Sequence, residues 1–210
     1  MNSFVICPND YLKQEIQAFY HSDYHGGDAE LRNTIGTTEN IICTLKNQFQ
    51  DKSNEVLNQA VNNLIQILKI ELPEILKKTG KNNLTVCLIP RAKALTYYSA
   101  NQLVFKKALS LLISKLNGFS DGINFIIRHT DTKTTHLERS GYGGTGKLPY
   151  IGITKETCTI SDNVKGKDIL LIDDLYTRTV NIDEDAIQAL LDKGAKSVVF
   201  YSLGKTASRL

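Results

Sequence analysis

The stretch Ile169-Leu170-Leu171-Ile172-Asp173-Asp174 places two adjacent acids directly after four aliphatic residues. A short, fully apolar run is typical of a strand that is buried on both faces of a parallel sheet. Two carboxylates are costly to bury without partners, so we expect them to face a ligand or a cation in the loop that leaves the strand. Ligands of open parallel sheets lie beyond the carboxyl ends of the strands, which makes this loop the first candidate for a site.

The segments after Gly80 alternate between short apolar runs and stretches with a helical period. Strands are expected at residues 84–89, 123–127, 150–153, 168–172 and 197–203, and helices at residues 99–116 and 183–193. Asp183-Glu184-Asp185 places three acids at the start of the second helix, where they complement its positive end. Strands that alternate with helices predict an α/β fold, with a mainly parallel sheet flanked by helices as in Rossmann-like proteins.

The chain before Gly80 has a helical pattern. Apolar residues recur at intervals of three and four, on one helix or on two helices joined near Pro73: Leu57, Val61, Leu64, Leu68, Leu72 and Ile75. The polar, turn-rich residues 21–28 show no clear period, so the fold of the first forty residues stays open. We therefore divide the chain into a mostly helical N-terminal extension or hood, residues 1–80, and an α/β core, residues 81–210.

The bulk composition narrows the class of protein. The formal net charge of the 210 residues is only +3, and the Lys and Arg residues are scattered, which argues against nucleic acid as the main partner. The four cysteines lie far apart without zinc-finger or redox spacing, as suits a reducing cytoplasm. No stretch is long and apolar enough to span a bilayer. These features predict a soluble cytoplasmic protein without a membrane partner.

The residues after the two acids suit a phosphorylated sugar. Vicinal hydroxyls of a ribose are natural partners for Asp173 and Asp174, because a carboxylate accepts two charge-assisted hydrogen bonds. Residues 177–181 then lead into a helix N-terminus, where free backbone N–H groups and the helix dipole favour a phosphate. The competing interpretation is a core strand that ends in a solvated acidic turn, and it does not account for the loop and the capped helix together.

Residues 169–181 resemble the phosphoribosyl pyrophosphate (PRPP) signature of the type I phosphoribosyltransferases. That pattern is four apolar residues, two acids, an apolar residue, any residue, Thr-Thr-Gly, any residue and Thr. The resemblance implies that Asp173 and Asp174 bind the ribose 2- and 3-hydroxyls. It implies that a loop wraps the 5-phosphate, formed by Thr177, Arg178, Thr179, Val180 and Asn181. The chain looks closest to the competence-protein-F-like and amidophosphoribosyltransferase-like branch, without the N-terminal zinc-binding cysteines of competence protein F.

The loop departs from the family pattern at three positions. Arg178 replaces the second Thr, Thr179 replaces the Gly, and Asn181 replaces the last Thr. Loss of the Gly restricts a loop that must approach a phosphate closely or adopt a positive φ. Arg178 either supplies a charged donor to that phosphate, or fills the pocket or pairs with the acids and prevents turnover.

Two further segments take roles from the resemblance. The exit loop of the first core strand, Pro90-Arg91-Ala92-Lys93, stands at the position of the family's pyrophosphate-binding loop, and Arg91 joins the two acids as a catalytic candidate. Residues 131–149 are rich in Gly and polar residues, as expected of a lid that closes over the ligand. Candidate lid contacts to the pyrophosphate are Arg128, His136, Arg139 and Lys147.

A rival phosphate motif lies within this lid. The segment Gly141-Tyr142-Gly143-Gly144-Thr145-Gly146-Lys147 has the spacing of a P-loop. A P-loop also requires a preceding strand, a following helix and a Ser or Thr after the Lys, whereas Leu148-Pro149 follows here. A P-loop nucleotidase is therefore the weakest of the three functional hypotheses.

The resemblance implies an enzyme that binds PRPP with Mg²⁺, the metal being held through PRPP. It would transfer the phosphoribosyl group to an unidentified base or amine and release pyrophosphate. The alternative from another class is a non-catalytic PRPP-binding or nucleotide-binding regulator or defence-associated effector, whose N-terminal helices contact a protein partner. A homodimer is the usual form of the family.

Overall fold

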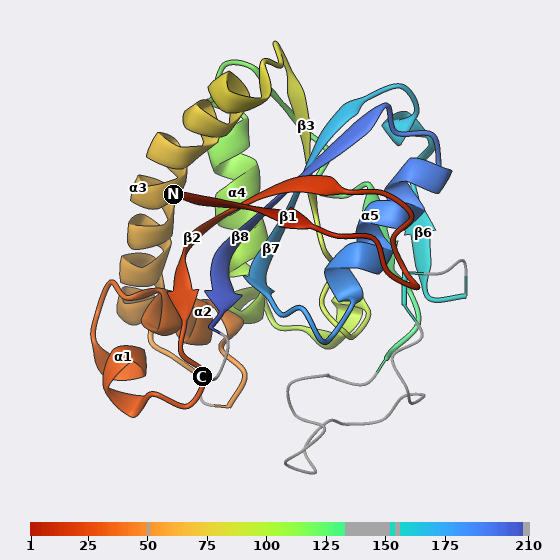
Figure 1. Cartoon of the computed structure of the whole chain (residues 1–210). Coiled ribbons are helices and arrows are strands. Elements are labelled where there is room, and N and C mark those ends of the chain that lie inside the picture. Colours follow the sequence, from red (N-terminus) through yellow and green to blue (C-terminus); the bar gives the residue numbers. More distant parts are fainter. Residues whose placement is uncertain (50, 133–151, 154–155, 208–210) are drawn as a thin grey trace.

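The computed structural model describes residues 1–49, 51–132, 152–153 and 156–207 (Figure 1). Its centre is a six-stranded sheet in the order β1-β2-β8-β7-β3-β4. The strand bounds are β1 (Asn2–Ile6), β2 (Ile16–Tyr24), β8 (Ser197–Thr206), β7 (Asp168–Tyr176), β3 (Leu84–Leu88) and β4 (Phe119–Asp121). β1 is antiparallel to β2, and the other neighbours in this sheet are parallel. The predicted α/β fold with a mainly parallel sheet is confirmed.

Helices cover both faces of this sheet (Figure 1). One apolar cluster packs a face against α2 (Thr38–Lys46), α3 (Asn54–Thr79) and α4 (Val104–Ile113). A second cluster packs the opposite face against α5 (Ile182–Asp192). α1 (Ala29–Asn33) and three 3₁₀ turns, η1 (Leu95–Tyr97), η2 (Ala100–Gln102) and η4 (Asp162–Val164), complete the described helical segments. None of the helices in the described ranges is long and apolar enough to cross a membrane.

Strand β7 owes its apolar sequence to its place between the two clusters. Leu170 and Ile172 belong to the cluster under α2, α3 and α4, whereas Ile169 and Leu171 belong to the cluster under α5. Successive side chains of a strand point to opposite faces, so burial of both faces requires an unbroken apolar run. All four side chains are fully shielded from solvent. The prediction of a doubly buried strand at 168–172 is therefore confirmed.

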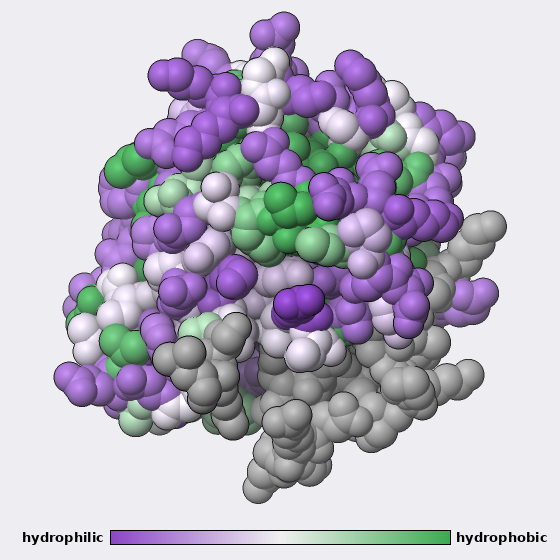
Figure 2. All heavy atoms as spheres, viewed as in Figure 1, coloured by the Kyte–Doolittle hydropathy of each residue, from purple (hydrophilic) through white to green (hydrophobic). Residues whose placement is uncertain are grey.

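The N-terminal eighty residues combine strands with helices. β1 and β2 extend the core sheet beyond β8, and β2 pairs in parallel with β8. α3 runs without a break through Pro73 and is capped by Gly80, whose φ of 64° is left-handed. An apolar area of the molecular surface lies over β1 and β2, where Val5 is 53% exposed (Figure 2). The sequence pattern located α3 but not the two strands.

Several element boundaries differ from the prediction. The helix expected at 99–116 is the short turn η2 followed by α4, which ends at Ile113. Of the strand expected at 123–127, only Ile126 and Ile127 are in a strand, β5 (Ile126–Arg128), because the chain turns after β4 through hydrogen bonds to Asp121 and Gly122. β5 pairs with β6 (Cys158–Ile160) in a separate antiparallel ribbon. Of the strand expected at 150–153, Gly152 and Ile153 are described and lie outside any strand.

A buried carboxylate ties α3 to the sheet. Glu71 is 5% exposed, and it accepts hydrogen bonds from the Tyr201 hydroxyl at 2.6 Å and from His21 Nδ1 at 2.8 Å. Burial alone raises the pKa of Glu71, but the hydrogen bonds from His21 and Tyr201 and the nearby positive charges hold its net pKa below the ordinary value. The network therefore stabilises the ionised carboxylate.

The substitution Tyr201→Phe tests this network. Because it leaves Glu71 with one donor fewer, we expect the free energy of unfolding at neutral pH to fall by about 1–3 kcal/mol in urea titrations. Since the pKa of Glu71 is lowered on folding, the contribution is present above the ordinary pKa of 4.5 and is lost as the pH falls. Tyr11→Phe, at an exposed tyrosine, is the control. Equal stability of both variants would contradict the assignment.

Candidate functional site

The strand order creates a topological switch point between β3 and β7. From β3 the chain proceeds outward to β4 and then returns to β7 and β8 on the other side of β3. In open α/β sheets, ligands bind at such a point, beyond the carboxyl ends of the strands. The backbone N–H of Ile89, just after β3, donates to the Ile172 carbonyl at 3.0 Å. The exit loop of β3 and the acids of β7 therefore meet at this edge.

Asp173 and Asp174 lie inside β7 rather than in the loop after it. β3 pairs with β7 as far as Ile172, whereas β8 continues to pair with β7 as far as Tyr176. β7 thus extends beyond β3 by four residues, with one side still held by β8. The expectation that the acids occupy an exit loop was wrong, because β8 is long enough to keep this segment in the sheet.

The two carboxylates point to different sides of the sheet. Asp174 pairs with Lys46 Nζ of α2 at 3.0 Å, and each of these side chains is 22% exposed. Asp173 is hydrogen-bonded to the carboxyl group of Asp183 at the start of α5. Adjacent residues of a strand alternate between faces, which explains this division. The two carboxylates therefore do not lie side by side on one face of the sheet.

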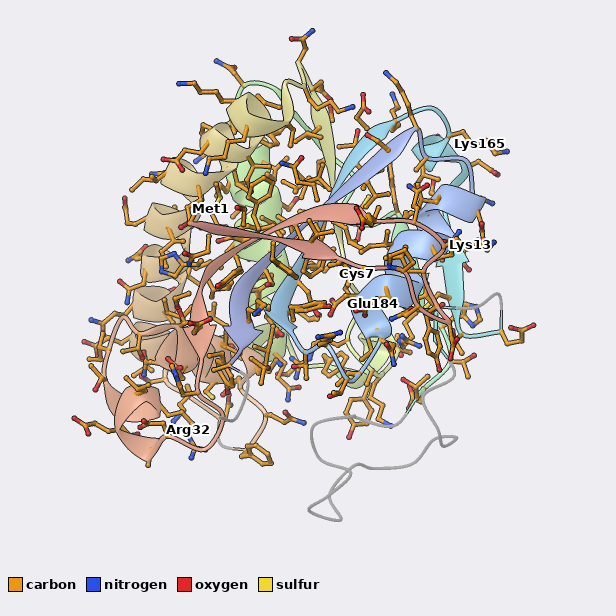
Figure 3. The ribbon with its side chains drawn as sticks, in the orientation of Figure 1. Met1, Cys7, Lys13, Arg32, Lys165 and Glu184 are labelled. Carbon is orange, nitrogen blue, oxygen red and sulfur yellow. The ribbon has the colours of Figure 1, made fainter. Side chains whose placement is uncertain are left out.

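The surroundings of Asp173 are acidic and poorly hydrated. Asp183 is 2% exposed and Glu184 is 1% exposed, and Glu184 accepts a hydrogen bond from the Tyr176 hydroxyl at 2.8 Å. Figure 3 places Glu184 at the N-terminal end of α5. Burial first, and then the charge of Asp174, raise the pKa of Asp173 to about 7. Burial, with Asp173 and Glu184 as neighbours, also raises the pKa of Asp183 well above its ordinary value.

The loop from Thr177 to Asn181 presents backbone donors. The backbone N–H groups of Arg178, Thr179 and Asn181 have no acceptor in the described part of the chain, and Arg178 and Thr179 are exposed. The positive φ of the loop, 60°, falls at Asn181, a residue type that tolerates it, and not at Thr179. The missing family Gly is therefore not required for the backbone conformation observed here. Such a loop before a helix of eleven residues suits an anion.

The side chains of the β3 exit loop turn into the protein. Arg91 Nη1 donates to the carbonyls of Lys46 at 3.1 Å and Gln102 at 2.8 Å, and its guanidinium lies 4.3 Å from the ring centre of Tyr98. Lys93 is 6% exposed, and its Nζ donates to the Thr132 carbonyl at 2.8 Å. These two cations fix the loop from inside.

The remaining predicted cations divide into two groups. Arg128 is 2% exposed, and its Nε donates to the Arg91 carbonyl at 2.9 Å, so it also supports the β3 exit loop. His136, Arg139 and Lys147 lie outside the described residues, as do most of the expected lid and the whole P-loop-like segment. Within the described ranges, the backbone N–H groups of Arg91 and Ala92 have no acceptor, so the donors that the exit loop offers an anion are main-chain ones.

A hollow of about 240 Å³ lies between the end of α2 and the η2 turn. Its lining residues are Asn47, Gln48, Phe49, Asp51, Ser99 and Gln102. Phe49 is 78% exposed, and Gln102 Nε2 donates to the Asn47 carbonyl at 3.2 Å. Because Arg91 donates to the Gln102 carbonyl, this hollow lies next to the segment that holds the β3 exit loop.

Four residues that shape the site were not predicted to take part in it. Lys46, at the end of a helix, had the pattern of an ordinary C-terminal cation. Asp183 and Glu184 were interpreted through the helix dipole alone, although their place two and three residues after the predicted phosphate-binding loop was a usable signal. Ser202 lies opposite Asp173 on β8, is fully buried, and its Oγ has no partner in the described structure. No motif indicated that serine.

Comparison with known proteins adds no relative to this description. No protein-family model matches the chain, and no curated protein matches it in sequence.

Proposed function

We propose that the chain binds a phosphorylated ribose, with PRPP as the preferred form, at the switch point between β3 and β7. One observation carries the proposal. A loop with three backbone N–H groups that have no acceptor among the described residues stands between an acidic strand end and a helix N-terminus at this edge. Carboxylates suit sugar hydroxyls and backbone donors suit a phosphate, so the arrangement matches both ends of the ligand.

The ribose would lie over the end of β7. Asp174 is the accessible acceptor for a sugar hydroxyl, because its side chain is 22% exposed. Lys46 neutralises Asp174 without a ligand and would offer its ammonium group to a phosphate oxygen once the ligand is bound. Arg178, exposed at the start of the loop, supplies a second cation for the 5-phosphate. Asp173 accepts the neighbouring hydroxyl from the opposite side of the strand.

The reaction that we propose is displacement of pyrophosphate at the ribose carbon C1 by a nitrogen nucleophile. The C1–O bond breaks as the C1–N bond forms, and positive charge develops on the ring. The chain would act mainly by positioning, with Asp173 and Asp174 orienting the ring and the backbone N–H groups of Arg91 and Ala92 donating to the diphosphate. The hollow beside Lys46 gives the base or amine an approach.

Mg²⁺ would enter this site with the diphosphate of the ligand, where it neutralises charge on the leaving group. The described residues contain no group of three or more His, Cys, Asp or Glu side chains placed to hold a metal ion. The donor set at the acidic edge therefore fits a metal carried by PRPP better than one held by side chains alone.

A second candidate function is binding of PRPP or a nucleotide without transfer. The favouring observation is that Arg91 and Lys93, the predicted pyrophosphate-binding cations, already donate to backbone carbonyls. Cationic side chains stabilise the negative charge on a departing diphosphate. Arg91 and Lys93 instead hold the backbone of this region in place. Binding of PRPP by calorimetry without pyrophosphate release, across a panel of bases and amines, would favour this regulator.

The double substitution Asp173→Asn and Asp174→Asn tests ligand binding. Because the amides no longer accept charge-assisted hydrogen bonds, we expect binding of PRPP with Mg²⁺ to disappear in calorimetry while circular dichroism stays unchanged. Asp168→Asn is the matched control at the opposite end of the same strand, where Asp168 pairs with Lys81 at 2.8 Å. It should bind PRPP normally. Unchanged affinity of the double variant would refute the proposed function.

The substitution Arg178→Ala tests the contribution of the loop to binding independently of the two acids. Loss of a charged donor to a phosphate should weaken PRPP binding by about 10-fold or more, corresponding to about 1.5–3 kcal/mol. Arg32→Ala on α1 is the control, since Arg32 lies well away from Glu184 and the start of α5 (Figure 3). If Arg178→Ala binds as tightly as the unmodified protein, Arg178 does not contact the phosphate.

A further inference from the structure

Two neighbouring carboxyl groups at the site are joined by a hydrogen bond. The carboxyl group of Asp173, in β7, contacts that of Asp183, at the start of α5. An ionised carboxylate has acceptors only, so a hydrogen bond between two carboxyl groups requires that one of them carries a proton. This contact therefore requires one proton that belongs to the pair and not to either residue.

The groups that face this pair do not remove the need for that proton. Asp174 and Tyr176 approach from β7, Glu184 from α5 and Lys46 from α2, whereas the charge of Arg178 acts on Tyr176 and Glu184. Lys46 is bonded to Asp174, and no ion pair within 4.0 Å joins a described cation to Asp173 or Asp183. The pair is therefore surrounded by more negative than positive groups.

Two buried atoms beside the pair are unsatisfied. Asp183 Oδ1 has no hydrogen-bond partner in the described structure, and its residue is 2% exposed. Ser202 Oγ, also without a partner there, belongs to the residue opposite Asp173 on β8, so it lies on the same face of the sheet. Of the two carboxyl groups, only that of Asp173 accepts a hydrogen bond from a described main-chain N–H, that of Asp174 at 2.7 Å. Asp183 is accordingly the member that ionises least readily.

We propose that Asp173 and Asp183 share one proton in the ligand-free protein, and that Asp183 is a positioning residue that makes ribose-phosphate binding depend on pH. The second part rests on the proposed function. For Asp173 to accept a hydroxyl hydrogen bond as a full carboxylate, the shared proton must pass to solvent. The hydrogen bond between the carboxyl groups is then replaced by one from the ligand. Proton and ligand compete for the same oxygen.

The raised pKa values of both carboxyl groups agree with this geometry, and they fix the sign of the effect on stability. A group whose pKa rises on folding binds a proton that the unfolded chain releases. The free energy of unfolding should therefore decrease as the pH rises from the ordinary aspartate pKa of 3.8 through about 7.

Carbon NMR of carboxyl-labelled aspartate tests the shared proton without any ligand. We expect resonances of Asp173 and Asp183 that titrate well above pH 4 in the unmodified protein, and a lower titration point for Asp173 in Asp183→Asn, whose amide donates permanently. Asp168, whose pKa is lowered to about 2 first by its hydrogen bond with Lys81, provides a low-titrating internal reference. If Asp173 and Asp183 both titrate near pH 4, the proton is not shared.

Calorimetry with ribose 5-phosphate between pH 5 and pH 8 tests the role of Asp183 in binding. Below the titration point of the pair, affinity of the unmodified protein should fall by up to about tenfold per pH unit, as one-proton competition requires. The ligand phosphate also titrates near pH 6, but this affects the unmodified protein and Asp183→Asn equally, so the ratio of their affinities isolates the pair.

The two measurements separate the possible failures. A ratio of affinities that is constant with pH overturns the positioning role of Asp183. Absence of ribose 5-phosphate and PRPP binding at every pH overturns the proposed function, while the NMR titration still decides whether the proton is shared.

Discussion

The burial of β7 on both faces is the constraint on which the structure depends. Leu170 and Ile172 fill the cluster under α2, α3 and α4, and Ile169 and Leu171 fill the cluster under α5. β7 pairs in parallel with β3 on one side as far as Ile172 and with β8 on the other side as far as Tyr176. Because β3 stops first, the polar end of β7 is open on one side and supported on the other, which is where the candidate site forms.

The electrostatics of that end are asymmetric. Asp174 lies beside a cation and some solvent, so it is ready to accept a ligand hydroxyl. Asp173 lies among acids at the start of α5, where burial favours its protonated form. Two residues of the same type, adjacent in sequence, therefore differ in chemistry because they face opposite layers of the fold. A ligand that contacts both must approach along the strand axis, over the end of β7.

The sequence was sufficient to predict the α/β class, the doubly buried β7 and the helix that is capped by Gly80. These features depend on local periodicity and on a glycine with left-handed φ, which the amino-acid pattern carries directly. It was not sufficient for β1 and β2, because the second half of β2 is polar and lacks alternation. The orientation of the Arg91 side chain could not be predicted either, because its acceptors, the carbonyls of Lys46 and Gln102, come from other segments of the chain. The type of a residue does not show whether its side chain stabilises the fold or binds a ligand.

The contacts of Arg91 have a mechanical consequence for the site. One guanidinium joins the last residue of α2, the η2 turn and the exit loop of β3, and it stacks on Tyr98. Loops that must be ordered during binding lose conformational entropy at that moment, which weakens affinity. Here the ordering occurs during folding, so the exit loop and Lys46 meet a ligand as one preorganised body. A displacement of the loop by a bound diphosphate would be transmitted through Arg91 to the end of α2, and from there to Asp174.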